Sequence, residues 1–182
     1  MVTRTALTDG FVLLRPIDEA DFEHYCEAAG ESFAEVSRWM PWSADLTREE
    51  VHRLYVSGIG DWEAGTSYVF NVFDPGDRSY LGLCFLAPVD SAHKAANLGY
   101  WVRTSRTKRG VATAATRLLA CFGLEEIGLL RIELVIATAN LASQRVAEKS
   151  GAVREGVLRN RIVVRDKVHD AVMYSIIPSD AL

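Results

Sequence analysis

The sequence predicts a mixed α/β (α+β) fold: one domain over residues 1–182, with a single mixed sheet of about six or seven strands flanked by helices. Amphipathic helical segments alternate with short β-rich runs along the chain, which favours a sheet covered by helices. The 182 residues, about half of them apolar and a quarter charged, have the size and composition of one globular domain. No repeat, low-complexity segment or linker divides them.

The first half of the chain is expected to contain more helix than strand. Its elements, in order, are a strand at 11–15, a helix capped by Asp18, a helical piece at 32–39, and a helix from Thr47 to Gly65. The last of these begins with a capping box, because Thr47 and Glu50 occupy the N-cap and N3 positions. Its inward stripe is expected to comprise Val51, Leu54, Tyr55, Ile59 and Trp62.

The second half is expected to supply most of the sheet. In order, we expect strands at 67–73 and 79–87 around the turn 74–77, a polar connection at 88–94, a strand at 98–103, a helix from Gly110, a buried strand at 131–137, a helix at 140–150, and strands at 154–164 and 168–177. Asp, Pro and Gly at 74–77 are strong turn residues, and Gly151 suits the end of the short helix. The last two strands are expected to form an antiparallel hairpin around 165–167.

The stretch from 98 to 124 carries the clearest functional signal. A strand here turns through a Gly-containing loop into a helix, whose apolar face is given by Val111, Ala115, Leu118 and Phe122. Unpaired N–H groups at the start of such a helix attract phosphate. Arg103, Arg106, Lys108 and Arg109 add four positive charges to a chain of net charge −4. An anionic ligand is one interpretation, and a solvated basic loop that binds nothing is the other.

Several classes of function are disfavoured. A Walker-type nucleotide loop needs Lys and Ser or Thr directly after its last Gly, whereas Val111 and Ala112 follow Gly110 here, and no G-x-G-x-x-G occurs. The acidic net charge argues against nucleic acid as a principal ligand. Three distant cysteines, Cys26, Cys84 and Cys121, predict reduced thiols rather than a disulfide framework or a zinc cluster. No membrane span or signal peptide is recognised, so a cytoplasmic protein is expected.

Six short motifs resemble one family when taken together and in order. They are Gly99-Tyr-Trp-Val102, Thr107-Lys-Arg-Gly-Val-Ala112, Asn140-Leu-Ala-Ser143, Glu148-Lys-Ser-Gly151, Glu155-Gly-Val-Leu-Arg159, and His169-Asp170 before Met173-Tyr174. In this order and spacing they resemble the GNAT superfamily of N-acetyltransferases, in its RimJ/RimL-type branch. The resemblance covers nearly the whole chain and implies the GNAT fold, acetyl-CoA as cosubstrate and no metal.

The resemblance also implies where acetyl-CoA is bound. The family's pyrophosphate loop, Gln/Arg-x-x-Gly-x-Gly/Ala, falls on 107–112, where Gly110 and Ala112 match and Thr107 departs from the pattern. The strand 100–102 is expected to pair with the pantetheine arm, and the N–H near Val102 to act as an oxyanion donor. The residues expected at the cofactor are Tyr100, Trp101, Val102, Thr107, Lys108, Arg109, Gly110, Val111, Ala112, Thr113, Asn140 and Ser143. The small residues after Gly110 fit phosphate, but they fit simple helix propensity equally well.

Catalytic roles are implied for Asn140, Ser143 and Val102. Asn140 is expected either to contact the cofactor or to cap the helix that follows, and both can hold at once. Many GNAT enzymes place a Tyr seven residues after this Asn to protonate the leaving thiolate, but Ala147 stands there. Ser143, directly or through water, is therefore the best remaining hypothesis for the proton donor.

The acceptor side is less defined by the sequence. Some members of the branch carry a carboxylate at the position of Ile162, so the general base has to be sought elsewhere. The candidates are Glu31, Glu35, Asp61, Glu63 and His169. His169 and Asp170 also fit a structural pair at a hairpin start, and Glu155 fits a residue that fixes a turn. Trp39 and Trp42 are expected to bind substrate, or else to belong to the core.

Three functions remain open at this point. The first is acetylation of the N-terminal α-amine of a protein or peptide, by direct attack on acetyl-CoA. The second is the same chemistry on a small amine such as an antibiotic, an amino-acid derivative or an aminoacyl nucleotide. The third is a CoA-binding regulatory module without catalysis. A homodimer is left open, and no nucleic acid or membrane partner is expected.

Overall fold

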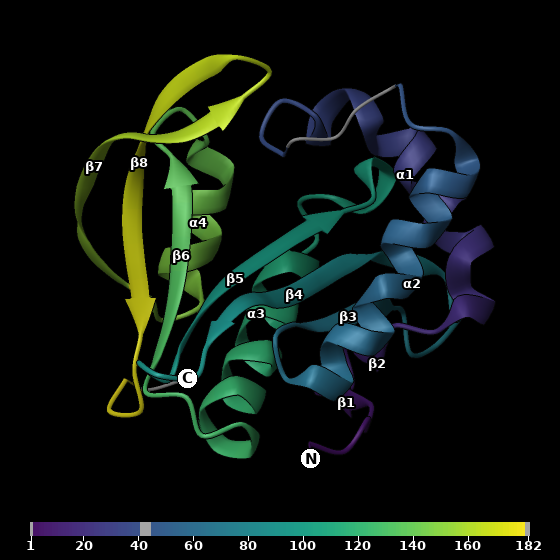
Figure 1. The fold of residues 1–182 in the computed structure, drawn as a ribbon, viewed down its shortest axis with the longest axis horizontal. Helices are drawn as coiled ribbons and strands as arrows, with labels where there is room; N and C mark the ends of the chain where they lie inside the picture. The colour runs from purple at the N-terminus through teal and green to yellow at the C-terminus, as the bar shows by residue number, and fades with distance from the viewer. Residues whose placement is uncertain (1, 41–44, 181–182) are drawn as a thin grey trace.

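The protein is described here by a computed structural model that covers residues 2–40 and 45–180. An eight-stranded sheet forms its centre, in the order β1-β2-β3-β4-β5-β6-β8-β7 (Figure 1). The strands are β1 Leu7–Thr8, β2 Leu13–Pro16, β3 Tyr68–Phe73, β4 Tyr80–Asp90, β5 Ala95–Val102, β6 Arg131–Ala137, β7 Val153–Val164 and β8 Lys167–Ile176. All neighbouring strands are antiparallel except β5 and β6, which are parallel.

Helices cover both faces of this sheet. They are α1 Phe22–Val36, α2 Arg48–Ala64, α3 Val111–Cys121 with a π-helical extension over Phe122–Glu126, and α4 Leu141–Lys149. α1 packs on the face that carries Leu83 and Trp101, whereas α3 and α4 contribute to the main core on the opposite face. Successive side chains of a strand point to opposite faces. Tyr100 and Trp101 on β5 therefore belong to different layers, Tyr100 to that of α3 and α4, and Trp101 to that of α1.

Most of the predicted elements are present, including the capping box at Thr47 and Glu50. The structure has eight strands rather than the expected six or seven, because Leu7–Thr8, just before the predicted first strand, pairs with β2 as an additional edge strand, β1. The expected separate helical piece at 32–39 is wrong: α1 runs unbroken to Val36. The expected polar connection at 88–94 is also wrong in part, since β4 continues to Asp90 and pairs there with Ala95.

The stripe predicted for α2 is only partly buried. Tyr55 and Trp62 are buried, but the side chain of Leu54 is exposed. Asp18 caps a short 3-10 helix at Glu19–Asp21 rather than α1 itself, with its carboxylate accepting a hydrogen bond from the N–H of Ala20. These differences concern exposed positions and the ends of helices, where burial places little constraint on which residue types occur.

Candidate active site

The two central strands of the sheet separate along their length. β5 pairs with β4 from end to end, but with β6 only over Ala95–Asn97, opposite Arg131–Glu133. Beyond that point β5 and β6 diverge, as Figure 1 shows. Backbone N–H and C=O groups in a sheet normally find partners in the neighbouring strand. The second half of β5 therefore presents an unpaired edge in the middle of the sheet, which is a place for an extended ligand to bind.

The register of β4 and β5 determines which groups face this edge. The N–H of Arg103 donates to the carbonyl of Leu81 (2.8 Å), so those two residues form a hydrogen-bonded pair. Hydrogen-bonded and non-hydrogen-bonded pairs alternate in an antiparallel ladder. Val102, opposite Gly82, is thus in a non-hydrogen-bonded pair, and Tyr100 is likewise. Their N–H and C=O groups point away from β4, toward the unpaired side.

The loop after β5 ends in the N-terminus of α3. Lys108 and Gly110 both have positive φ (61° and 88°), which turns the chain sharply into the helix. The first backbone bond of α3 comes from the N–H of Ala114 to the carbonyl of Gly110 (3.0 Å). The N–H groups of residues 111–113 precede it and have no carbonyl partner within the helix. Amide groups arranged in this way form a concave site for an anion.

Only part of the positive charge predicted for this loop is available to a ligand. Arg103 is held by two carboxylates of α1, Glu27 (2.7 Å) and Glu31 (2.5 Å). Arg106 lies 3.9 Å from Asp77. Lys108 and Arg109 are exposed and form no ion pair with the residues that the structure describes. Of the four basic side chains of the loop, Lys108 and Arg109 therefore remain accessible to an anion, while Arg103 ties the loop to α1.

Glu31 fastens the same loop to α1. Its carboxylate accepts hydrogen bonds from the Arg103 guanidinium (2.5 Å) and from the N–H of Ser105 (2.8 Å). The hydrogen bonds from Ser105 and Arg103 lower the pKa of Glu31 to about 2. A carboxylate held so strongly in its charged form is a poor proton acceptor. Glu35 belongs to the same contact, since its carboxylate accepts from the Thr104 hydroxyl (3.3 Å).

The start of α4 lies on the β6 side of the opening between β5 and β6. Asn140 is the N-cap, and its Oδ1 accepts a hydrogen bond from the N–H of Ser143 (3.1 Å). The capping role predicted for Asn140 is therefore confirmed. Ser143 itself is half-buried in the first turn of the helix. Ala147, one turn further on, is fully buried in the core.

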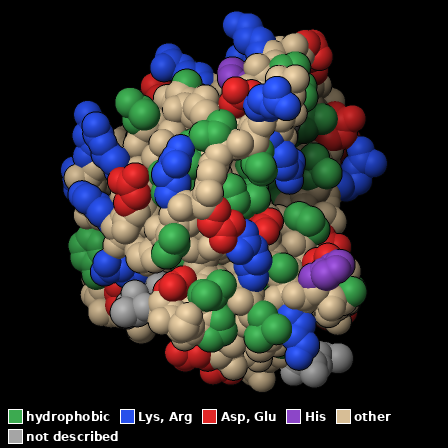
Figure 2. All heavy atoms as spheres, turned by 90° about the vertical axis from the view of Figure 1, so that its left-hand side faces the viewer, with side chains coloured by type: hydrophobic (Ala, Val, Ile, Leu, Met, Phe, Trp, Pro, Cys, Tyr) green, Lys and Arg blue, Asp and Glu red, His purple; other side chains and the backbone are tan. Residues whose placement is uncertain are grey.

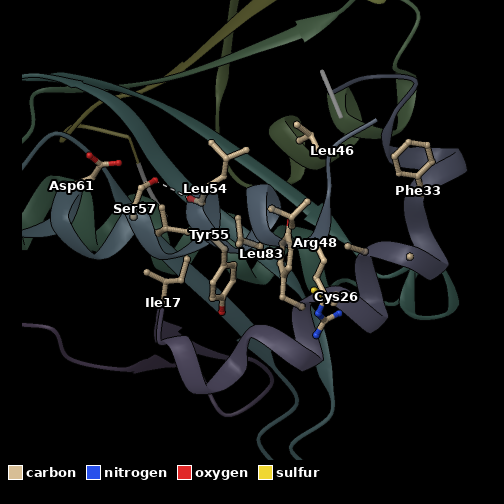
Figure 3. Close-up of a pocket in the computed structure, with 16 residues that line it drawn as sticks. Ile17, Cys26, Phe33, Leu46, Arg48, Leu54, Tyr55, Ser57, Asp61 and Leu83 are labelled. Atoms are coloured by element: carbon tan, nitrogen blue, oxygen red, sulfur yellow. Dashed lines mark hydrogen bonds between the residues drawn. The ribbon is translucent and has the colours of Figure 1, made fainter. Parts of the chain in front are cut away.

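A groove of about 800 Å³ opens between α1 and α2 on the opposite face of the sheet. Figure 3 shows Asp61 and Phe33 near its two ends, with Ile17, Tyr55 and Leu83 between them. The walls are mostly apolar, and the charged groups at the groove are Asp61 and Arg48. Leu83, in its floor, pairs across the ladder with Trp101. The groove therefore reaches the strand next to β5, close to the site of the divergence.

The two tryptophans predicted to bind substrate are only partly accounted for. Trp39 follows α1 and is half-buried, but it is not among the described residues that line the groove. Trp42 lies outside the described residues. The side chain of Trp101 is buried against α1, where its ring meets that of Tyr25 edge-on (5.9 Å between centroids). Trp101 is in a hydrogen-bonded pair with Leu83, so its backbone N–H and C=O point toward β4, and neither these groups nor the side chain faces the unpaired edge of β5.

The terminal hairpin combines structural and candidate functional residues. Glu155 accepts a bidentate pair of hydrogen bonds from Arg131 (2.7 and 2.5 Å), which lowers its pKa to about 2 and ties β7 to β6. Asp170 accepts from the N–H of Asn160 (2.8 Å) at a bulge. His169 lies directly opposite Ile162 in the β7–β8 ladder. Figure 2 shows the outer side of this region, where basic and acidic side chains are interspersed.

The tip of the hairpin approaches the groove. The Arg165 guanidinium lies over the ring of Phe33, 5.9 Å from its centroid, and Phe33 lines the end of the groove. Of the remaining candidates for a base, Asp61 lines the groove and Glu63 is exposed on α2.

Sequence reasoning missed the role of α1, whose carboxylates hold the loop after β5. No local signal marks a contact between residues more than 70 positions apart.

The described ranges 2–40 and 45–180 contain no group of three His, Cys, Asp or Glu side chains that could hold a metal ion. Cys26, Cys84 and Cys121 are all free. None of the helices in these ranges is both long enough and apolar enough to cross a membrane.

Comparisons with known proteins identify the family. The profile of the family described as "Acetyltransferase (GNAT) domain" matches residues 12–153. A Bacillus subtilis protein named "Putative ribosomal N-acetyltransferase YdaF" is 28% identical over 181 residues, which are 95% of this chain and 94% of that protein. The chain therefore belongs to the GNAT acetyltransferase family. It is an acetyl-CoA-dependent N-acetyltransferase with the mixed GNAT sheet that its sequence predicts.

Solved structures agree on the fold. RimL, a ribosomal L7/L12 α-N-protein acetyltransferase solved in complex with coenzyme A, has a TM-score of 0.88 at 19% identity, covering 95% of this chain and 98% of its own. The microcin C7 self-immunity acetyltransferase MccE, solved with acetyl-CoA and AMP, has a TM-score of 0.84 at 19% identity and covers 93% of each chain. Identities this low establish the fold alone.

Proposed function

We propose that this enzyme transfers an acetyl group from acetyl-CoA to the N-terminal α-amine of a protein or peptide, by direct attack in a ternary complex. The observation that carries the proposal is the unpaired edge of β5, with the N–H of Val102 directed into it and the N-terminus of α3 at its end. The ribosomal acetylation named for the Bacillus subtilis relative supports a protein acceptor.

The residues present fit acetyl-CoA. The free N–H groups of 111–113, with Lys108 and Arg109 beside them, supply donors and positive charge for a pyrophosphate. The N–H and C=O groups of Tyr100 and Val102 supply strand-like partners for the amides of a pantetheine arm. Asn140 and Ser143 lie across the divergence, at the start of α4. Bound there, acetyl-CoA would supply a thioester carbonyl for attack.

The chain's own groups account for the remaining steps. The N–H of Val102 is placed to stabilise the oxyanion that forms when the amine attacks, because it is a fixed donor on the open side of β5. The hydroxyl of Ser143 is the proton donor to the departing thiolate. No acyl-enzyme is required, and burial in β4 raises the pKa of the Cys84 thiol, which makes it an unsuitable nucleophile.

The attacking amine has to lose a proton, and the structure narrows the choice of base. Glu31 is unsuitable because its pKa is about 2. His169 is the most favourable of the remaining candidates, since it projects beside Ile162, the position at which some members of the branch carry a carboxylate. Asp61 at the end of the groove is the second choice.

The groove between α1 and α2 supports a peptide acceptor over a small amine. Its volume of about 800 Å³ exceeds the space that one amino acid requires, and its walls are largely apolar. Several residues behind the α-amine could lie along it, with the amine directed past Leu83 toward Val102. Acetylation of a small amine is the alternative, and the MccE structure with AMP illustrates that this fold accommodates a small ligand.

A thiol-release assay with acetyl-CoA tests the proposal. The panel should contain peptides with the N-terminal sequences of ribosomal proteins, the same peptides with a blocked α-amine, free amino acids, aminoglycosides and aminoacyl nucleotides. We expect release with unblocked peptides and none with blocked ones. Release only with small amines would favour the alternative acceptor. Acetyl-CoA binding by calorimetry without release with any acceptor would indicate a CoA-binding module.

A further inference from the structure

The hydroxyl of Tyr100 is an unusual polar group in the core. Its oxygen is buried and makes no hydrogen bond of normal geometry with the described residues. The ring packs against the main core cluster, which includes Val111 and Ala115 of α3 and Ala147 of α4. Buried side-chain hydroxyls nearly always have a partner, because an unpaired one loses its bonds to water without replacement. A phenylalanine would fill the same space without that cost.

Ser143 is a polar neighbour of this hydroxyl. The two residues come from opposite sides of the divergence, Tyr100 from β5 and Ser143 from the first turn of α4. Burial raises the pKa of the Tyr100 phenol to about 12, and the Ser143 side chain lies close enough to interact with it. The Ser143 backbone is fixed separately by Asn140. Only its hydroxyl is left to be oriented.

We propose that Tyr100 is a positioning residue for Ser143: its phenol donates a hydrogen bond to Ser143 Oγ and thereby directs the Ser143 hydroxyl toward the leaving sulfur. The inference rests on the proposed function. Its geometric basis is the juxtaposition of a buried, unpartnered hydroxyl on β5 with a serine whose backbone is already clamped. In this scheme Ser143 remains the proton donor on α4, and Tyr100 on β5 orients it.

Tyr100 neither gains nor loses a proton in the acetyl transfer. As the amine nitrogen bonds to the acetyl carbon, the C–S bond breaks and the sulfur takes the Ser143 proton. The proton lost by the amine returns to Ser143 Oγ through the base and solvent. Tyr100 keeps its proton throughout, and the raised pKa keeps it a donor over the pH range in which such an enzyme works.

A double-mutant cycle of Tyr100→Phe and Ser143→Ala tests this. Tyr100→Phe removes one oxygen and leaves the packing intact, so we expect unchanged or higher thermal stability, a kcat lowered by about tenfold, and a KM for acetyl-CoA within about twofold of the wild type. In the Ser143→Ala background the same change should have no further effect, because the group that it positions is gone. A tyrosine that matters only for packing would not give this pattern.

Tyr68→Phe is the matched control. Tyr68 lies on β3 and is buried in the core cluster against which the partly buried Tyr100 packs, but it lies on a different strand from Tyr100. We expect it to retain the wild-type kcat. A wild-type kcat in Tyr100→Phe, or effects of the two substitutions that multiply in the double mutant, would overturn the inference alone. A wild-type enzyme that releases no thiol with any acceptor would instead overturn the proposed function on which it rests.

Discussion

Replacement of Gly82 by alanine should displace the proposed oxyanion donor without changing any polar side chain. Gly82 lies on β4 directly opposite Val102, with φ of +150°. A Cβ at this position would sit 2.1 Å from the Trp101 carbonyl oxygen and 2.9 Å from the Val102 Cα. Both neighbours are backbone atoms of β5. The clash therefore cannot be relieved by rotating a side chain.

The size of the effect follows from these distances. Real Cβ contacts are essentially never shorter than 3.0 Å, so β4 and β5 have to separate by about 1 Å at this point. A displacement of about 1 Å at a catalytic group typically costs about 10²-fold in rate. We therefore expect kcat to fall about 10²-fold, and overpacking to lower the free energy of unfolding by about 1–3 kcal/mol.

Thiol release with the best peptide acceptor measures the rate, and thermal unfolding measures the stability. Gly156→Ala is the matched control, since Gly156 is also a strand glycine but an added Cβ meets nothing within 4 Å there. We expect near wild-type activity in that control. If a folded Gly82→Ala enzyme turned over at the wild-type rate, the placement of the Val102 N–H would not matter to catalysis, and the oxyanion assignment would be wrong.

Three further variants probe the donor loop and the base. Lys108→Glu combined with Arg109→Glu should weaken acetyl-CoA binding at least tenfold and abolish its salt dependence; equal affinity by calorimetry would remove these residues from the anion site. Glu31→Gln should lower stability at neutral pH but keep the pH dependence of kcat. Because the pKa of Glu31 is lowered from 4.5 to about 2, its stabilising contribution exists above about pH 4.5 and is lost as pH falls toward 2, so the two unfolding curves should converge there. His169→Gln should lower kcat about 10²-fold at unchanged acetyl-CoA affinity, and a wild-type kcat would direct the search to Asp61.

The donor half of the site could be predicted from the sequence because its signals are local. A strand that leads through Gly110 into an amphipathic helix is recognisable within fewer than 30 residues, and so is the Asn140 cap three residues before the N–H that it binds. The direction of the Val102 N–H is different. It depends on which pairs of β4 and β5 are hydrogen-bonded, and a sequence does not reveal that register.

Long-range contacts account for what the sequence did not reveal. Arg103 resembled a phosphate ligand because its charge lies in the loop, yet the structure shows it paired with Glu27 and Glu31. Tyr100 was expected near the cofactor as part of a strand motif, but the isolation of its hydroxyl in the core has no counterpart in the residue pattern. For both the Arg103 guanidinium and the Tyr100 hydroxyl, the hydrogen-bonding surroundings depend on segments that lie far away in the chain.

α1 connects the two halves of the site, because its two sides have different partners. One side carries Glu27, Glu31 and Ser32, which hold the loop after β5 through Arg103, Ser105 and Thr104. The adjoining side carries Cys26, Ala29, Gly30 and Phe33, which line the groove proposed for the acceptor. A helix packed in this way moves as a unit. Substitutions in the groove that shift α1 should therefore change acetyl-CoA affinity as well as acceptor preference. A variant establishes that the groove binds the acceptor only if it alters acceptor preference and leaves acetyl-CoA affinity unchanged.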